Sequence, residues 1–318
     1  MVARALLLLF AALVLGGGLA RADTPPATIA IEVGAMPIAT AAEVYYAEDQ
    51  GFFKAAGLDV KLTILNNGAA ILAAAAAGSV DIGFGSPAPV IAARQRGIPV
   101  RFIAPAVYYQ GGPNPQAPTV LVVAKDSPIR TASDLNGKTV AVGGLNDLGY
   151  YSTVAWIDKN GGNPATIQFV EMPYSAMGAA LQAGRVSAGC SIEPYLSALT
   201  GTRDLGIVND AVSNRYMLAG WFAMDPWIGR NPEALKRFGA VLQRSARWAN
   251  THQRESAAIL AHYTGTSPEA AATMARVSYE TSTGVSPQVV QPVIDLLQKY
   301  GKLTSPPATS DLTTPSKP

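Results

Sequence analysis

Residues 42–86 alternate helices with strands, and this alternation constrains the fold more than any other feature of the sequence. An amphipathic helix is expected at the start of the segment, with Glu43 on its polar side. A strand over 58–65 and an Ala-rich helix over 69–77 follow, and a short apolar strand over 80–84 ends the segment. Repeated alternation of this kind predicts an α/β fold with a mostly parallel sheet flanked by helices.

Three loops of the first half are expected at one edge of this sheet, where the strands reach their carboxyl ends. They cover residues 34–37, 66–68 and 85–88. In open α/β sheets ligands bind at this edge, because loop amides and helix N-termini converge there. We therefore expect ligand contacts from Met36, Pro37, Asn67 and Ser86.

The second half of the chain repeats the order of strand, turn and helix without detectable sequence identity to the first half. A break rich in Gly and Pro follows residue 110 and is the expected crossing between two lobes. A return crossing with a helical C-terminal part would complete a two-lobed clamshell. The expected organisation is lobe 1 over 27–112 and 222–303, lobe 2 over 113–221, and a disordered Pro-rich tail over 304–318.

Residues 1–22 have the features of a cleaved secretory signal. An apolar run over 5–20 follows Arg4 and is too short to span a bilayer, and Ala20-Arg21-Ala22 fits the small-x-small cleavage rule. The cleavage point lacks a cysteine, so a lipoprotein is not expected. We expect a mature chain that starts at Asp23 and is soluble in the periplasm; the alternative is a membrane anchor left in place.

The charge balance argues against nucleic acid and anionic membranes as partners. The chain has 24 basic and 22 acidic residues, and loss of the signal removes Arg4 and Arg21 but no acid. The mature protein would then carry no net charge, whereas nucleic-acid binding requires a basic surface. Cys190 is the single cysteine, so no internal disulfide can form. We expect a monomer.

The sequence offers little for catalysis, metal binding or nucleotide binding. No GxGxxG follows the first strand, and no Walker A sequence (GxxxxGK followed by Ser or Thr) occurs. The two histidines, His252 and His262, fall on C-terminal helices away from the strand ends. Cys190 lies in an apolar strand without a neighbouring base. We therefore expect a binding protein and not an enzyme, with no catalytic residue, no metal and no cofactor.

Aromatic and polar residues gather at the strand ends and crossings of the second half. Aromatic rings can sandwich a planar ligand, and stacking contributes ~0.5–1.5 kcal/mol per pair. Free amides at helix N-termini suit an anion, but Asp147 and Glu193 place negative charge at the same edge of the sheet. We expect two or three of the aromatic side chains to contact ligand. The further candidate ligand-binding residues are Tyr109, Asn146, Asp147, Tyr150, Tyr174, Glu193, Tyr195 and Trp221.

Several motifs follow one another between Ile29 and His252. In order they read YYAEDQGFFKAAGLDVKL, GSVDIGFGS, QRGIPVRFIA, SPIRTASDLNGKTVAVGG, ALQAGRVSAG and EPY. This series resembles the substrate-binding proteins of nitrate/sulfonate/taurine-type ABC importers, a group that includes the pyrimidine-precursor (thiamine-biosynthesis-like) binding proteins. The resemblance implies a type II periplasmic-binding-protein clamshell and an inner-membrane ABC permease with its ATPase as partner. It also makes Glu193 similar to the acid with which pyrimidine-binding relatives hold an aminopyrimidine edge.

The expected ligand is a small planar or aromatic molecule that contains nitrogen or a carboxylate. An aliphatic sulfonate such as taurine, or nitrate, is the alternative. Relatives that hold sulfonates carry Ser or Thr in the loop that here reads GGLNDLGYY, so this chain departs from their pattern. A ligand-binding sensor that docks on a receptor is a second alternative. An enzyme similar to the pyrimidine synthases is a third, although their Cys-rich motif and reactive His are absent here.

Overall fold

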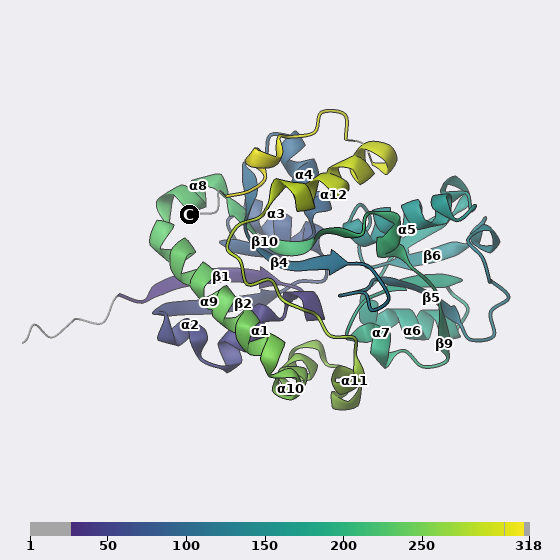
Figure 1. Ribbon diagram of the computed structural model, residues 1–318, viewed down its shortest axis with the longest axis horizontal. Coiled ribbons are helices and arrows are strands. Elements are labelled where there is room, and N and C mark those ends of the chain that lie inside the picture. Colours follow the sequence, from purple (N-terminus) through teal and green to yellow (C-terminus); the bar gives the residue numbers. More distant parts are fainter. Residues whose placement is uncertain (1–26, 302, 315–318) are drawn as a thin grey trace, which may run out of the picture.

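The computed structural model describes residues 27–301 and 303–314, which form two α/β lobes joined by two crossings of the chain (Figure 1). Lobe 1 lies at the left of the figure and contains both ends of the described chain, whereas lobe 2, in teal, lies at the right. The signal predicted over residues 1–22 lies outside the described residues. No helix in the described part is long and apolar enough to cross a membrane.

Lobe 1 is built on a five-stranded sheet in which one strand comes from far along the chain. In spatial order its strands are β2 (Leu58–Ile64), β1 (Ile29–Ala35), β3 (Ile82–Gly85), β10 (Arg215–Met224) and β4 (Val100–Gln110). β1 is parallel to β2 and β3, whereas β10 is antiparallel to both of its neighbours. Every residue of β3 is buried, as expected for a strand covered by helices on both faces.

Helices cover both faces of this sheet (Figure 1). One group is α1 (Glu43–Asp49), α2 (Phe52–Ala55) and the long α9 (Pro232–Thr251), preceded by η1 (Ala39–Ala41) and α8 (Asp225–Arg230). The other is α3 (Gly68–Ala76), α4 (Pro87–Gln95) and α12 (Pro287–Tyr300). Asn67 begins α3 by accepting a hydrogen bond from the Ala70 amide at 2.8 Å.

Lobe 2 repeats this arrangement. Its strands, in spatial order, are β7 (Gln168–Glu171), β6 (Thr139–Val142), β8 (Ala188–Ser191), β5 (Val120–Ala124) and β9 (Thr202–Ile207). β5 is antiparallel to both neighbours, as β10 is in lobe 1. The helices are α5 (Leu148–Lys159), α6 (Tyr174–Gln182) and α7 (Tyr195–Ala198), with short turns η2 (Ser133–Leu135), η3 (Pro164–Thr166) and η4 (Val208–Ala211). The predicted two-lobed α/β architecture is confirmed.

The last part of the chain spans both lobes. α10 (Gln253–Thr264) and α11 (Pro268–Thr273) lie at the lower edge of lobe 1, where α11 contacts α7 of lobe 2 (Figure 1). The chain then passes β4, where Tyr279 forms a bridge with Val107. The last element of the described residues is η5 (Thr309–Asp311).

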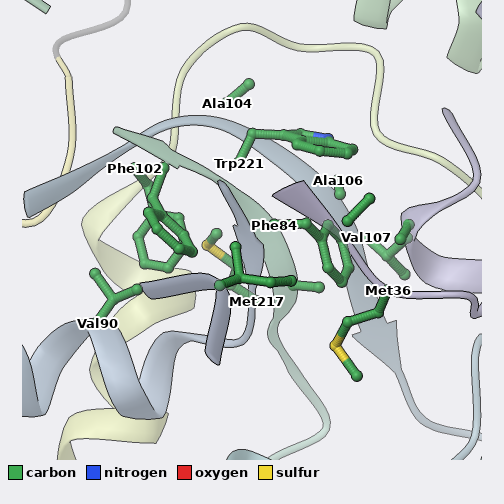
Figure 2. Close-up of a cluster of buried hydrophobic side chains, with 14 of the residues drawn as sticks. Met36, Phe84, Val90, Phe102, Ala104, Ala106, Val107, Met217 and Trp221 are labelled. Atoms are coloured by element: carbon green, nitrogen blue, oxygen red, sulfur yellow. The ribbon is translucent and has the colours of Figure 1, made fainter. Parts of the chain in front are cut away.

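The core of lobe 1 lies around β3, β4 and β10 (Figure 2). Trp221 on β10 packs edge-on against Phe84 on β3, with ring centroids 5.2 Å apart. Phe102 on β4 meets Phe222 on β10 at 6.4 Å. Met36, from the loop after β1, lies at the border of this cluster in the figure. The core therefore reaches the carboxyl ends of β1 and β3.

The structure differs from the sequence-based expectation at the return crossing. Lobe 1 was expected to resume at residue 222, but β10 begins at Arg215 and pairs with β4 from Gln110 onward. The reason is that residues 216–223 are mostly buried and apolar, so the whole strand is stabilised inside the lobe 1 sheet.

The tail was expected to be disordered over 304–318, and this is wrong for its described part, residues 304–314. Leu312 is fully buried, and its carbonyl accepts a hydrogen bond from the Phe102 amide at 2.8 Å. The Thr314 amide in turn donates to the Phe102 carbonyl at 3.0 Å. Pro- and Thr-rich composition predicted disorder, but one apolar anchor and two backbone bonds to β4 hold this segment in place.

Glu43 was also placed wrongly, because it is fully buried and not on a polar helix face. Its Oε2 accepts a hydrogen bond from Trp221 Nε1 at 2.8 Å, and its backbone carbonyl accepts one from the Ser245 hydroxyl at 2.6 Å. α9 covers the face of α1 that helical spacing alone assigns to solvent. A packed neighbour therefore overrides the local pattern.

Candidate functional site

A cavity of about 70 Å³ lies between the two lobes. The carboxyl ends of β1 and β3, strand β10, the crossing segment at 117–119, the N-termini of α5 and α6, and the end of β8 form its walls. Its lining comprises Met36, Ile38, Ala39, Thr40, Phe84, Ser86, Ala117, Pro118, Thr119, Asp147, Leu148, Gly149, Tyr174, Ile192, Glu193, Leu218, Ala219 and Val277. The predicted edge of the sheet is therefore the place where a cavity exists.

Ser86 and Asp147 join the lobes at this cavity. Ser86 precedes α4 of lobe 1, and its hydroxyl donates to Oδ1 of Asp147, which precedes α5 of lobe 2. The same oxygen accepts the Leu148 amide at 2.6 Å, so Asp147 also caps α5. Burial raises the pKa of Asp147 and is the largest influence on it, while the two hydrogen bonds act in the opposite direction.

Glu193 follows β8 and lines the cavity with only 5% of its surface exposed. Its Oε1 accepts hydrogen bonds from the Ser197 hydroxyl at 2.9 Å and the Ala275 amide at 3.1 Å, and its Oε2 accepts the Ser197 amide at 3.1 Å. Its backbone carbonyl accepts the Ala39 amide at 3.1 Å. Glu193 therefore ties lobe 2 to η1 and to the segment after α11.

Tyr174 supplies an aromatic wall at the start of α6. Its ring lies against Gly143. A Cβ atom at position 143 would be 2.2 Å from Cζ of Tyr174, so a larger residue there would clash with the ring. The ring stacks on Tyr195 with centroids 6.2 Å apart, and the Tyr195 hydroxyl donates to the Thr264 carbonyl at 3.3 Å. Burial raises the pKa of Tyr174 well above its usual value, so the phenol remains neutral.

Five of the predicted ligand-binding residues meet at the cavity: Met36, Ser86, Asp147, Tyr174 and Glu193. Pro37 lies between the cavity residues Met36 and Ile38, and Tyr195 lies two residues after Glu193, but neither lines the cavity. Asn67, Asn146 and Tyr150, with Asp147, instead border a wider groove of about 710 Å³ between α3, α4, α5 and α12. Asn67 Nδ2 donates to Glu171 Oε1 at 2.9 Å, so it links the lobes beside this groove.

Tyr109 and Trp221 lie in the interior of the protein, with 0% exposure, and do not line the cavity. The Tyr109 hydroxyl donates to Asp210, and Trp221 binds Glu43. Figure 2 shows Trp221 among the core side chains near Phe84 and Ala106. Aromatic residues at strand ends and crossings thus include packing residues that local sequence does not distinguish from ligand contacts.

Other cavity residues were not predicted from the sequence. Phe84 could have been found, because it ends the short strand that precedes the predicted Gly85-Ser86 loop. Thr119 and Leu218 lie where the chain crosses between lobes, and Val277 comes from beyond α11. No local signal marks these three, since their approach depends on how distant segments return to the cavity.

Nucleophile and metal chemistry have little support in the described residues. Cys190 is buried in β8, and burial raises the pKa of its thiol to about 12, so it stays protonated at neutral pH. Among residues 27–301 and 303–314, no group of three or more His, Cys, Asp or Glu could hold a metal ion. The arrangement supports binding by shape, hydrogen bonds and charge.

Comparison with solved structures supports the fold. The E. coli periplasmic aliphatic sulphonate binding protein SsuA has a TM-score of 0.72 at 21% identity, over 91% of this chain and 92% of that chain. The periplasmic nitrate-binding protein NrtA from Synechocystis PCC 6803 has a TM-score of 0.66 at 15% identity, over 76% and 69% of the two chains. The desulfurization enzyme DSZB has a TM-score of 0.66 at 17% identity, over 90% and 96%. The same fold thus carries binding proteins and an enzyme.

Sequence comparison gives a family. No curated protein matches the chain. The family model described as NMT1/THI5 like matches residues 39–256, which include all of lobe 2 and the lobe 1 loops at 66–68 and 85–88, whereas Met36, Ile38 and Val277 of the cavity lie outside the match. Because this match covers more than half of the chain, the protein belongs to the NMT1/THI5 like family.

Proposed function

We propose that this protein is a periplasmic solute-binding protein. It captures a small organic molecule between its lobes and presents the closed form to an inner-membrane ABC permease with its ATPase. Family membership and the two-lobed fold support this role. We further infer that residues 1–22 are removed on export, that the mature chain starts at Asp23, and that it works as a monomer without a chemical step.

One observation carries the proposal: the cavity is lined by residues of both lobes, and hydrogen bonds join the two lobes around it. Ser86 to Asp147, Asn67 to Glu171, and Ala39 to Glu193 are hydrogen bonds from lobe 1 to lobe 2 around or beside it. A solute in this cavity would contact both lobes at once. Hinge opening and closing around a ligand is the usual way in which two-lobed proteins capture and release it.

The lining of the cavity suits a compact ligand with an apolar, planar part. Phe84 and Tyr174 offer aromatic surface, and Ile38, Leu218 and Val277 offer aliphatic surface. Aromatic surface favours a planar molecule through stacking. A small nitrogen-containing aromatic compound is the ligand that we propose, with an aliphatic sulfonate as the alternative.

The experiment is to purify the exported protein and measure both its bound solute and its shape. Native mass spectrometry detects a co-purified molecule, and thermal denaturation is then followed with aminopyrimidines, aromatic carboxylates, alkanesulfonates and nitrate. A ligand specific to the folded state must raise the melting temperature. We expect one of these classes to do so and to leave the radius of gyration at the compact value of the closed form. Absence of a bound solute, and of any shift across the panel, would contradict the proposed function.

A further inference from the structure

Resting on the proposed function, we propose that the cavity selects a nitrogen ligand that presents positive charge or several N–H donors to Asp147, and that it rejects oxyanions. The ligand class is a small organic cation or a neutral amidine-like molecule.

The charge of the cavity wall is the first observation. Asp147 and Glu193 are its two ionisable acids, and no Lys, Arg or His is among the described residues that line it. An oxyanion in this space would face carboxylates with no cation to balance them. Because charge interactions strengthen as water is excluded, the repulsion is larger here than at the surface.

Asp147 is the acid with capacity left for a ligand. Glu193 already accepts three hydrogen bonds from Ser197 and Ala275. In Asp147, Oδ1 accepts from Ser86 and Leu148, whereas no described residue donates a hydrogen bond to Oδ2. Burial and the nearby Glu171 both disfavour its ionised form. A cationic N–H group next to Oδ2 would pair with the carboxylate and thereby stabilise the ionised form of Asp147.

The helix N-termini at the cavity provide the second, independent observation. An anion usually binds such an end through the free amides of the first turn. α4 begins Pro87-Ala88-Pro89, so two of its first three residues have no N–H to offer. α5 begins with its own carboxylate, because Asp147 accepts the Leu148 amide. The N-termini of α4 and α5 are therefore poor sites for a sulfonate or nitrate, the first because of its prolines and the second because of its negative charge.

The test compares isosteric ligands of opposite charge on the mature protein. Guanidinium and nitrate are planar and of similar size, and benzamidine and benzoate form a second such pair. Titration calorimetry at constant ionic strength, with guanidinium far below denaturing concentrations, measures each dissociation constant. We expect the cation of at least one pair to bind ten times or more tightly than its anion, in line with a charge-assisted hydrogen bond. Tighter binding of nitrate or benzoate would overturn the proposal.

Asp147→Asn then assigns the preference to one side chain. Asn still caps a helix and still accepts from Ser86, so the fold should persist. We expect this variant to bind the cation at least about tenfold more weakly and to reduce the preference for cation over anion. Asp204→Asn removes the same charge from the exposed part of β9 and is the matched control, with unchanged binding.

The outcomes separate this inference from the proposed function. An unchanged preference in a folded Asp147→Asn would overturn the role of Asp147 alone. If the variant does not fold, the isosteric pairs on the unmodified protein still decide the charge preference. If all four compounds fail to bind and no solute co-purifies, the proposed function fails and this inference fails with it.

Discussion

Glu43 places an acid inside lobe 1, where the interior has little to solvate it. Oε2 is bound by Trp221, but Oε1 is buried and has no hydrogen-bond partner among the described residues. Burial raises the pKa of Glu43 well above its usual range, Glu280 adds repulsion in the same direction, and the Trp221 bond opposes both. The core therefore favours the protonated, neutral acid.

We expect Glu43→Gln to weaken the pH dependence of stability. Because folding raises this pKa, the folded state holds a proton that the unfolded state releases above about pH 4.3. The free energy of unfolding then falls as pH rises from there toward the folded pKa, by ~1.4 kcal/mol per unit of pKa difference. The Gln side chain has no carboxyl proton to release, so this contribution to the pH dependence of the free energy of unfolding is lost in the variant.

Urea unfolding at about pH 4.5 and about pH 7.5 measures this difference. Relative to the unmodified protein, Glu43→Gln should gain stability at the higher pH. Glu48→Gln, on the exposed side of the same helix, is the control and should leave the pH profile unchanged. Parallel profiles for Glu43→Gln and the unmodified protein would show that Glu43 ionises as easily when folded as when unfolded.

At the scale of elements, β4 forms one edge of the lobe 1 sheet, and two distant segments cover its free side. The Glu280 amide donates to the Ala106 carbonyl at 2.8 Å, and residues 312–314 bond to Phe102. An uncovered edge strand offers unpaired backbone groups to other chains. The described part of the tail therefore protects the sheet as well as burying Leu312.

Deletion of residues 303–318 should lower the melting temperature and promote association. Loss of the buried Leu312 side chain alone removes about 1.5–3 kcal/mol of stabilisation. The freed edge of β4 should also make the protein self-associate as its concentration rises, which light scattering detects. Deletion of residues 315–318 alone is the control. If both deletions behave alike, residues 303–314 do not stabilise the sheet.

How far the sequence predicts these elements depends on whether their signal is local. The alternation of helix and strand over residues 42–86 is a local periodicity, so it predicted the elements around Ser86 and the edge where the cavity lies. The insertion of β10 between β3 and β4 depends on pairing across about a hundred residues, so no window of sequence contains it. The tail was mistaken for the same reason, because its order comes from its partner β4.

The residues of the candidate site also differ in whether a local sequence signal predicts them. Ser86, Asp147 and Glu193 lie in the loops that follow β3, β6 and β8, so topology brought them to the cavity. Trp221 and Val277 show the limit: the first is held in the core by Glu43, and the second reaches the cavity from beyond α11. Contact with a ligand depends on which side chain faces the cavity, and residue type at a strand end does not determine that.

At the scale of the whole molecule, α12 of lobe 1 holds α5 of lobe 2. The Tyr300 hydroxyl donates to Asp158 Oδ2 at 2.6 Å, and Lys299 Nζ lies 3.3 Å from the same oxygen. The Tyr300 bond, followed by Lys299, lowers the pKa of Asp158. This carboxylate therefore stays ionised at neutral pH, and its contribution is lost only as pH falls through the lowered pKa.

Tyr300→Phe should shift the ligand-free protein toward an open form at neutral pH, because it removes one bond between the lobes but keeps the ring. Small-angle scattering would record this as a larger radius of gyration. Tyr263→Phe is the matched control, since Tyr263 stacks on Tyr45 within lobe 1. An equal radius for both variants would mean that α12 does not restrain the lobes.

The placement of β10 also has a consequence for the order in which the chain is made. Lobe 2 is continuous in sequence, so a nascent chain that has released Ile207 holds every strand of the second sheet. The first sheet at that moment lacks the strand that separates β3 from β4. Lobe 1 is thus begun first but completed last. Until residue 224 has been synthesised, β3 and β4 lack β10, the strand that pairs with both of them.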